Sequence, residues 1–451
     1  MPDLGARPAL RDPATLGGVV APALATAEWP GDGWWKDYGD PQLAALIEEA
    51  LAGSPTLAVA DARARKAAAY AQGAGAAMLP TLSANAQVNE VKQSYNNGFP
   101  AQFVPKGLND TGRASLDLNY ELDFFGKNRA ALRAATSERE AAAIEARAAR
   151  LALATSVAAA YADLARLAAQ REVEVAAVKQ REEVAALVAR RVVSGLDTRG
   201  EQRQADAGVP LARGDLAATD EAIALTRNRL AALLGAGPER GAAIALPAPR
   251  ALSAPGLPAN LALDLVGRRA DIEVARRRAE AAAARITVAR AGFYPNVNLI
   301  GLVGFQSLGL SNLFAKGSDI AQGGAAISLP IFSGGRIEGS YRASRADYDE
   351  AVAQYDQTLV RALNEVADAA ASSQALGLRQ ADARLALAAS EEAYSIARRR
   401  YEGGLSPYLA VLTAQDALLR NRQLVAALDA RALTLNIELI RALGGGYSPK
   451  A

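Results

Sequence analysis

Hydrophobic and polar residues alternate without a break over the ten residues from Ser115 to Phe124. In an extended chain, one face would carry only apolar side chains: Leu116, Leu118, Tyr120, Leu122 and Phe124. The other face would carry only polar ones: Ser115, Asp117, Asn119, Glu121 and Asp123. A period of two residues predicts a two-faced β-strand. A water-soluble sheet would show the same alternation, but ten residues is also the length that crosses a bilayer at a tilt.

Three further segments are predicted to be strands: residues 81–91, 296–305 and 322–331. The first alternates cleanly, the second is blurred by apolar residues on its polar face, and the third is the weakest because of a proline near its end. The segments 93–112 and 307–321 are predicted to be exposed loops that join the strands into two hairpins.

Four strands are too few to close a barrel, because the smallest membrane barrels have about 8. An open sheet edge cannot lie in lipid, because its backbone polar groups would lack hydrogen-bond partners. If these strands lie in a membrane, several subunits must share one barrel. The pattern therefore predicts an obligate oligomer and leaves the number of subunits open.

The segments between the strands predict long helices rich in alanine, which has the highest helix propensity and allows close backbone approach. Six helices are expected: residues 56–77, 127–194, 198–234, 271–292, 335–402 and 406–443. Two of them would contain 68 residues, on the order of 100 Å at about 1.5 Å per residue. Such lengths are typical of coiled coils and helical tubes.

The same order of elements occurs twice along the chain. The clearest match begins at the Gly-Leu pairs 195–196 and 404–405, and each matching segment closes at a glycine 40 residues later. We interpret residues 41–235 and 261–444 as two copies of one unit, each reading helix, strand, loop, strand, long helix, turn, helix. The rest is an extended N-terminal segment, a connector rich in Pro, Gly and Ala, and a C-terminal tail: residues 1–40, 236–260 and 445–451.

Composition removes several classes of function. The chain has no His and no Cys, which excludes Ser-His-Asp and Cys-His nucleophilic sites and zinc sites built on imidazole or thiolate. No pair of carboxylates has more than chance spacing, so we expect no enzyme activity, cofactor or metal. A net charge of +2 gives no electrostatic signal for nucleic acid. No stretch of 18 apolar residues is free of charge, so we predict no transmembrane helix.

Four motifs follow one another along the chain. They are Trp-Trp-Lys-Asp-Tyr-Gly-Asp-Pro-Gln-Leu at 34–43, Glu-Leu-Asp-Phe-Phe-Gly-Lys at 121–127, Leu-Pro-Ile-Phe-Ser-Gly-Gly-Arg at 329–336 and Arg-Ala-Leu-Gly-Gly-Gly-Tyr at 441–447. In their order and spacing, these motifs resemble those of the outer-membrane factors of tripartite efflux and secretion systems. Within these TolC/OprM-like proteins, the chain is most similar to the OprM/NodT branch, over residues 30–447.

The resemblance implies an α+β membrane protein that forms a homotrimer. Each protomer would give four strands to a 12-stranded transmembrane β-barrel in the lipid of the outer membrane of a Gram-negative bacterium. Its helices would form a long α-helical barrel in the periplasm. The implied partners are a periplasmic adaptor (membrane fusion) protein and an inner-membrane transporter of the RND class. The implied function is the exit duct of a multidrug efflux pump, which conducts small molecules passively.

Two alternatives belong beside this interpretation. The same fold serves type I secretion systems that export a polypeptide, although the OprM-like motifs favour small molecules. A coiled-coil scaffold without a membrane role is disfavoured by the strand alternation.

Many members of this branch carry a lipidated Cys at the mature N-terminus, which this sequence lacks. The first residues are not a signal peptide, so we expect that a signal peptide and that Cys precede the sequence, the alternative being an unlipidated member.

In the family, residues after the second helix–helix turn narrow the periplasmic end of the tube. By position, the Tyr, Leu, Asp and Arg that do so fall on Tyr401, Leu409, Thr413 and Asp416. Because Thr and Asp replace the family's Asp and Arg, the ion pair between those two positions cannot form. Leu409 is the strongest candidate, since three symmetry-related leucines can narrow a pore by dewetting. The other interpretation of Tyr401 and Leu409 is coiled-coil packing, and Asp416 would form an acidic ring or pair with Arg420.

The turns near 194–198 and 403–407 would form the tip of the helical tube. Gly195 and Gly404 permit the positive φ that such turns require. Leu196 and Leu405 beside them would be exposed and available to an adaptor hairpin. Other charged residues are interpreted as surface charge or as pairs with neighbouring Glu: Arg199, Arg203, Asp206 and the arginine runs 276–278 and 398–400.

Overall fold

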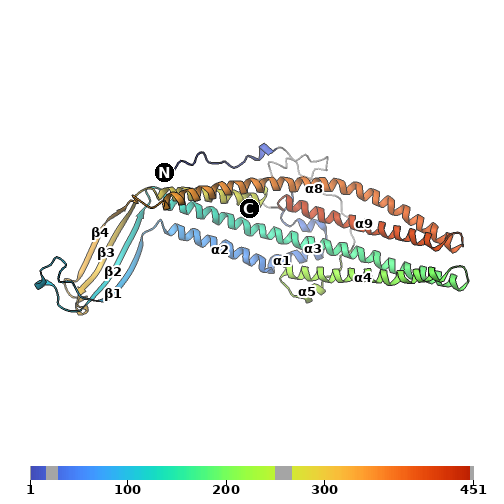
Figure 1. Cartoon of the computed structure of the whole chain (residues 1–451), viewed down its shortest axis with the longest axis horizontal. Coiled ribbons are helices and arrows are strands. Elements are labelled where there is room, and N and C mark those ends of the chain that lie inside the picture. Colours follow the sequence, from blue (N-terminus) through green and yellow to red (C-terminus); the bar gives the residue numbers. More distant parts are fainter. Residues whose placement is uncertain (1, 17–28, 249–266, 447–451) are drawn as a thin grey trace. The chain divides into compact units, whose positions relative to one another are not determined.

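The computed structural model describes residues 2–16, 29–248 and 267–446 (Figure 1). The chain divides into two compact units, and each takes segments from both halves of the sequence. Unit 1 comprises residues 1–10, 63–143 and 274–355, and unit 2 comprises residues 11–62, 144–273 and 356–451.

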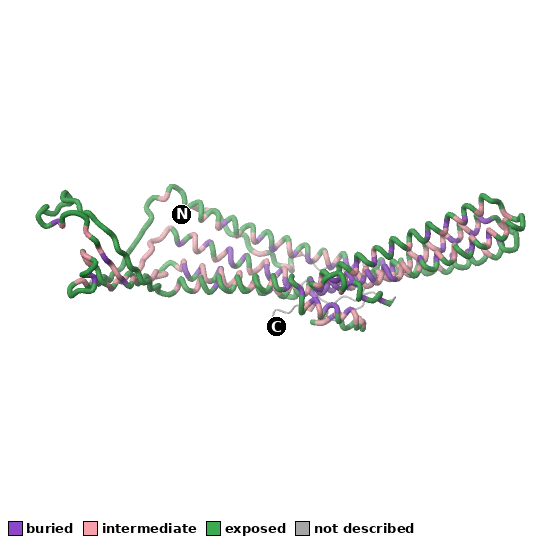
Figure 2. The backbone as a smooth tube through the Cα atoms, turned by 90° about the horizontal axis from the view of Figure 1, so that it is seen from below, coloured by how far each residue is buried: buried purple, intermediate pink, exposed green. Residues whose placement is uncertain are grey.

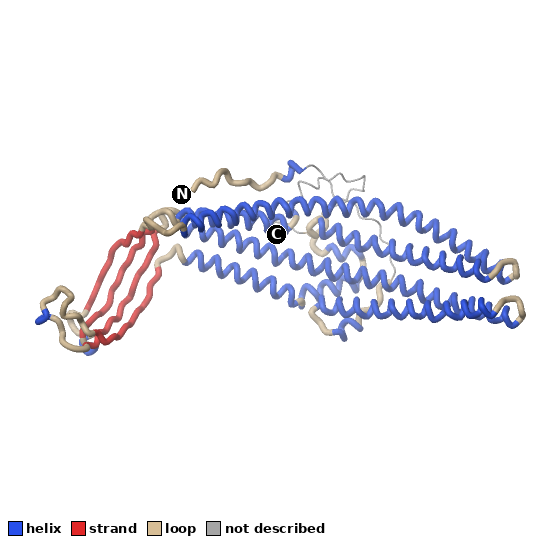
Figure 3. The backbone as a smooth tube through the Cα atoms, in the orientation of Figure 1, coloured by secondary structure: helices blue, strands red, loops and turns tan. Residues whose placement is uncertain are grey.

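Unit 1 contains a four-stranded antiparallel sheet in the order β1-β2-β3-β4 (Figure 3). Its strands are β1 (Thr81–Val91), β2 (Asn109–Leu122), β3 (Asn296–Leu308) and β4 (Asp319–Ser328). Leu116 of β2 lies opposite Ala84 of β1 and Val303 of β3, so the register brings apolar residues together on one face. β1 and β4 are the two edges of this sheet.

Three strands differ in their bounds from the predicted ones. β2 covers Asn109–Leu122 instead of 115–124. It begins earlier because residues without alternation, such as Gly112, still pair with β1 and β3, and it ends earlier because the pairing with β3 stops at Leu122. β3 continues to Leu308 instead of 305, for the same reason. β4 covers Asp319–Ser328 instead of 322–331, because its pairing with β3 begins at Asp319 and ends before Pro330. Pairing with a neighbouring strand thus sets the ends, which the side-chain pattern alone did not reveal.

The apolar face of the sheet is exposed. Its members Leu82, Leu116, Leu118, Val303 and Ile327 are 42% to 70% exposed. Figure 2 shows the corresponding green along the strands. A sheet in a water-soluble protein normally packs its apolar face against a core. No part of the described chain covers this face, so its apolar side chains are available for contact with an apolar environment outside the chain.

Six long helices correspond to the six predicted ones. They are α2 (Pro55–Ala76), α3 (Lys127–Val193), α4 (Arg199–Leu234), α7 (Ala270–Ala291), α8 (Arg336–Glu402) and α9 (Tyr408–Ala442). Two short helices were not predicted, α1 (Pro41–Gly53) and α5 (Pro238–Ala242). The start of α1 nevertheless has a clear local cause. Pro41 occupies its first turn, and the Asp40 carboxylate accepts hydrogen bonds from the backbone N–H groups of Gln42 and Leu43.

The main core of unit 2 lies where α1 meets α3, α4 and α9. It contains Ile47 of α1, Val157 and Leu164 of α3, Leu230 of α4 and Ile437 of α9. A stretch of 18 residues in α3 is apolar enough to cross a membrane by length and composition, but 61% of it is buried inside the protein. Its apolar character is accounted for by this helical packing.

The C-terminal glycine motif lies against backbone and side chains of other segments. A Cβ atom at Gly444 would lie 2.0 Å from the carbonyl oxygen of Arg268, and one at Gly445 would lie 2.0 Å from a methyl carbon of Leu151. Both residues also have positive φ, of 89° and 54°. Only glycine fits both demands, so this part of the predicted family motif is explained by packing.

The N-terminal segment of unit 1 lies against α8. Arg345 donates to the carbonyl oxygens of Gly5 and Ala6, and the Tyr348 hydroxyl donates to that of Pro8 at 2.9 Å. Of the predicted connector 236–260, the part after residue 248 lies outside the described residues, as does the predicted C-terminal tail after residue 446.

Candidate functional site

The turn between α3 and α4 has a defined geometry. Gly195 has φ 71°, its N–H donates to the carbonyl of Val192 at 3.0 Å, and the N–H of Leu196 donates to the carbonyl of Arg191 at 2.9 Å. This pair of bonds is the Schellman motif, which ends a helix at a glycine. Thr198 then begins α4 with a capping box to Glu201.

The turn between α8 and α9 repeats this geometry. Gly404 has φ 73°, its N–H donates to the carbonyl of Tyr401 at 3.0 Å, and the N–H of Leu405 donates to that of Arg400 at 2.7 Å. The predicted positive φ of both glycines is therefore confirmed. The leucines that follow them, Leu196 and Leu405, are 66% and 72% exposed.

Asp197, which follows the first turn, connects the two hairpins. Its carboxylate lies 3.0 Å from Nε of Arg191 and accepts a hydrogen bond from the hydroxyl of Tyr401. The Arg191 guanidinium lies 4.5 Å from the centre of the Tyr401 ring. Because the side chains of Arg191 and Asp197 are only 12% and 6% exposed, this is a shielded ion pair. Burial, followed by the hydrogen bond to Asp197, raises the pKa of Tyr401, which stays neutral and donates.

Tyr401 itself is completely buried. It packs in a cluster with residues of four helices: Val184 and Val188 of α3, Ala205 of α4, Tyr394 of α8 and Tyr408, Val411 and Leu418 of α9. Within one chain, Tyr401 therefore has the coiled-coil packing role that was the alternative to a gate.

Asp416 pairs with a residue that the sequence did not suggest. Its carboxylate accepts a hydrogen bond from Nη2 of Arg181 on α3 at 2.9 Å, so the predicted alternative of a pair with Arg420 is wrong. Arg181 reaches α9 by crossing Gly208 of α4, where a Cβ atom would lie 2.9 Å from its Nη1. Arg181 thus holds the carboxylate and Gly208 leaves room for the Arg181 side chain, an arrangement that a four-residue helical spacing could not predict.

The other two predicted aperture residues are on the exposed side of α9. Leu409 is 62% exposed. Thr413 is exposed as well, and its hydroxyl donates to the carbonyl of Leu409 at 2.9 Å, one turn back in the same helix. Leu409 is therefore available for contacts outside its own chain.

The remaining charged residues near the tip form ordinary surface pairs. Arg203 lies 3.7 Å from Asp206, and both side chains are accessible to solvent, whereas Arg199 is exposed. Of the two arginine runs, the one at 398–400 is next to the α8–α9 turn, where Arg398 pairs with Glu183 and Glu402. The other belongs to α7 in unit 1, where Arg277 pairs with Glu140 and Glu280. This agrees with their interpretation as surface charge.

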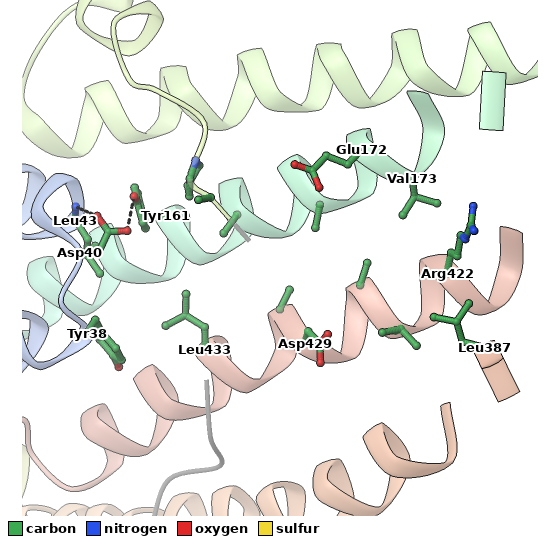
Figure 4. Close-up of a pocket in the computed structure, with 17 residues that line it drawn as sticks. Tyr38, Asp40, Leu43, Tyr161, Glu172, Val173, Leu387, Arg422, Asp429 and Leu433 are labelled. Atoms are coloured by element: carbon green, nitrogen blue, oxygen red, sulfur yellow. Dashed lines mark hydrogen bonds between the residues drawn. The ribbon is translucent and has the colours of Figure 1, made fainter. Parts of the chain in front are cut away.

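A cavity of about 380 Å³ lies between α3 and α9, farther from the tip (Figure 4). Its charged side chains are largely engaged by neighbours. The Asp40 carboxylate accepts from the Tyr161 hydroxyl at 2.7 Å, Asp429 pairs with Arg384 at 2.9 Å, and Arg422 pairs with Glu391 at 3.0 Å. The described residues contain no group of three or more Asp, Glu, His or Cys side chains that could hold a metal ion. The geometry here is that of structural hydrogen bonding.

The sequence matches the model of a protein family described as outer membrane efflux protein. The match covers residues 46–236 and again residues 261–445, so each half of the chain, with its strands and its long helices, is matched once. The chain belongs to the outer membrane efflux protein family. In agreement with this membership, it is 30% identical to the multidrug resistance outer membrane protein MdtP of Escherichia coli over 443 residues, 94% of this chain and 88% of that protein.

Two further comparisons extend the family relationship. The fusaric acid resistance protein FusA of Burkholderia cepacia is 36% identical over 337 residues. That match spans 73% of this chain and 63% of FusA, which is less than two thirds of its length. Among solved structures, the outer membrane protein VceC of Vibrio cholerae has a TM-score of 0.88 and 45% identity, covering 93% of this chain and 100% of VceC. The outer-membrane channel OprN has a TM-score of 0.87 and 28% identity, covering 98% and 100%.

Proposed function

We propose that this outer membrane efflux protein is the exit duct of a tripartite multidrug efflux pump. It conducts small molecules passively from a periplasmic adaptor and an inner-membrane RND-type transporter to the exterior, and it catalyses no reaction. The observation that carries this proposal is the match of both halves of the chain to the outer membrane efflux protein family, and the likeness to the outer-membrane channel OprN supports a duct. The relatives named for multidrug and fusaric acid resistance support small organic molecules as the cargo.

The proposed assembly is a homotrimer. One chain supplies four strands with two open edges, β1 and β4. Pairing β4 of each protomer with β1 of the next satisfies these edges in lipid, and three copies would give a 12-stranded barrel. The exposed leucines and valines of the sheet would then face lipid, and the helices would form the periplasmic tube.

We further propose that the chain contains an internal repeat, in which residues 41–235 and residues 261–444 are two copies of one structural unit. Corresponding helices have nearly equal lengths: α2 and α7 have 22 residues each, α3 and α8 have 67 each, and α4 and α9 have 36 and 35. The family model also matches the chain twice. A repeat places one hairpin tip in each copy, so a trimer would have six tips.

Of the four residues that the sequence placed at the aperture, Leu409 and Thr413 are exposed on α9, whereas Tyr401 is buried and Asp416 pairs with Arg181. Leu409 forms the hydrophobic constriction, because it is exposed on α9 at the tip. Asp197 and Asp416 act inside each protomer, where Arg191, Tyr401 and Arg181 tie the hairpins together. Thr413 lies one turn from Leu409 and would line the same opening.

A purified, detergent-solubilised trimer is expected to form channels in planar lipid bilayers. Deletion of the gene is expected to make cells hypersensitive to small drugs, and the wild-type gene should restore resistance. Absence of both conductance and rescue would contradict the duct. If drug sensitivity stayed unchanged while secretion of a polypeptide stopped, the chain would instead serve a type I system.

The tip leucines yield a separate test of adaptor docking. The double variant Leu196→Asp/Leu405→Asp should abolish drug resistance, because a charge replaces the apolar contact on each exposed tip. Trimer abundance should not change, since neither side chain is part of a core. The control is Leu211→Asp, an equally exposed position in the middle of α4. Full resistance in the double variant would show that these residues do not contact an adaptor.

A further inference from the structure

Unit 2 contains a second cavity, of about 430 Å³, whose lining includes none of the tip residues described above. It lies between the Asp32–Trp35 segment, α3 and the C-terminal glycines, and Trp34, Trp35, Arg147, Arg150 and Gly446 are among its lining residues. A volume of a few hundred Å³ is in the range of small-molecule sites, which combine an apolar lining with a few polar groups. Leu51, Leu151 and the indole rings provide the apolar part here.

The cavity wall contains two hydrogen-bond donors without acceptors. Nε1 of Trp34 and Nε1 of Trp35 are buried and have no partner within the described residues. Trp34 is only 3% exposed, and its ring packs edge-on against Trp35 and Tyr38, so it is held in place. A buried donor left unpaired costs about 1–3 kcal/mol, and native proteins normally satisfy such groups with protein atoms, water or a ligand.

The charges of the lining favour an anion. The charged residues of the lining are two arginines of α3, Arg147 and Arg150, and one carboxylate, that of Asp32. Arg150 is exposed, and no hydrogen bond or ion pair of its guanidinium is found among the described residues. The argument for an anion therefore rests on the Arg150 guanidinium and on the two indole N–H donors, which have no acceptor among the described residues.

We propose that this cavity binds a small organic anion, with a carboxylate or phosphate group attached to an apolar body. The anionic group would lie near Arg150 and accept a hydrogen bond from at least one of the two indole N–H groups. The apolar body would pack against Leu51, Leu151 and the indole rings. An inorganic ion alone would leave most of the apolar cavity unfilled, and water alone would leave the positive charge unmatched.

The chain offers a direct readout, because it contains only three tryptophans, Trp29, Trp34 and Trp35. In the detergent-solubilised full-length protein labelled with ¹⁵N-tryptophan, three indole N–H resonances are expected. Titration with benzoate should shift at least one resonance of Trp34 or Trp35, assigned through Trp→Phe variants. The resonance of Trp29, which stacks on Arg268 at 4.8 Å and is not among the cavity residues, should stay in place.

Matched probes and variants identify the chemistry. Benzyl alcohol has the same ring without charge and should bind much more weakly, as should inorganic phosphate, which has no apolar body. Arg150→Gln should weaken benzoate binding about tenfold to a hundredfold, the loss expected for one hydrogen bond to a charged group. Lys179→Gln, an exposed cation of α3 outside the cavity, should have no effect. Ala148→Phe should block binding by filling space, with an unchanged circular dichroism spectrum and trimer elution volume.

The source of the ligand is tested in the same titration with a short-chain phosphatidic acid. Tighter binding of this lipid than of benzoate would assign the site to lipid phosphates, and the reverse would assign it to free organic acids. The proposal is overturned if neither probe moves the Trp34 or Trp35 resonance, which would mean that water alone fills the cavity. It is equally overturned if Arg150→Gln and wild type bind benzoate with the same affinity.

Discussion

Replacing Asp197 with alanine is expected to shift the tip of the proposed duct toward its open state by about tenfold to a hundredfold. The substitution removes the acceptor of the Tyr401 hydroxyl and the partner of Arg191 in one step. A hydrogen bond to a charged group contributes about 1.5–3 kcal/mol, and about 1.4 kcal/mol corresponds to a factor of ten in an equilibrium. The Tyr401 bond joins the α3–α4 turn to α8, and the ion pair with Asp197 holds Arg191 against the Tyr401 ring, so the loss of both frees the two hairpins to separate.

The open state can be measured in two ways. Single-channel recordings in planar bilayers should show higher conductance and longer openings for Asp197→Ala than for wild type. Cells that carry the variant should become sensitive to a large hydrophilic antibiotic that the outer membrane normally excludes. Tyr401→Phe should give a smaller change, because it keeps the ring beside Arg191 and the ion pair of Arg191 with Asp197.

The control for this prediction is Asp215→Ala, which removes an exposed carboxylate from α4. Trimer abundance, measured by electrophoresis of unheated samples, separates an opened duct from a misfolded one. If trimers of Asp197→Ala form normally and their conductance equals that of wild type, the Arg191–Asp197–Tyr401 cluster has a purely structural role.

The long elements of this fold are readable from the sequence because their signals extend over many residues. No proline interrupts 127–194, and α3 occupies Lys127–Val193 as a single helix. The positive φ of Gly195 and Gly404 was predictable for a similar reason, since a glycine that ends a helix has a specific local conformation. Short elements such as α1 were missed, although Asp40 and Pro41 mark its start.

The contacts at the tip were less predictable, because they join residues far apart in the chain. Asp416 and Arg181 are 235 positions apart, and nothing local to either residue indicates their pairing. Asp197 offered one clue, because the second turn has Ser406 at the corresponding place. A difference between two copies of a repeat is a reason to look for a residue that acts between them. Likewise, a strand end such as Asn109 depends on its partner strand.

Replacing Arg269 with methionine is expected to destabilise the protein by about 3–5 kcal/mol, the usual cost of breaking a buried ion pair by removing one partner. The Arg269 side chain is 7% exposed and lies 2.7 Å from Asp271 and 2.8 Å from Glu365. It also donates to the carbonyl of Ala442 at the end of α9 at 3.0 Å. In the variant, the half-buried carboxylates of Asp271 and Glu365 and the carbonyl oxygen of Ala442 therefore lose the hydrogen bonds that Arg269 donates. Arg269→Lys should lose less, because it keeps the charge but not the two-pronged contact with Asp271.

The pH dependence identifies the cause of this loss. Burial opposes ionisation of Asp271, but the hydrogen bonds and charge of Arg269 outweigh it and lower the pKa of Asp271. A lowered pKa stabilises the fold above the unfolded value of about 3.9, and this contribution disappears as the pH falls through the lower folded value. In Arg269→Met, burial is opposed only by the backbone hydrogen bond from Ile272 and the charge of Arg361, so the pKa of Asp271 is expected to rise and protonation should relieve the variant.

Thermal melts of wild type and Arg269→Met in the same detergent should consequently differ most at neutral pH. The gap should narrow as the pH falls toward about 4, and it should close only once the pH is below the lowered pKa of Asp271 in the wild type. The matched control is Arg441→Met, an exposed arginine at the end of α9, which should melt like wild type at every pH. A gap between wild type and Arg269→Met that stays constant with pH would attribute the loss to packing and to the Ala442 carbonyl. Convergence would attribute it to the carboxylates, and would explain why an arginine lies where α7, α8 and α9 meet.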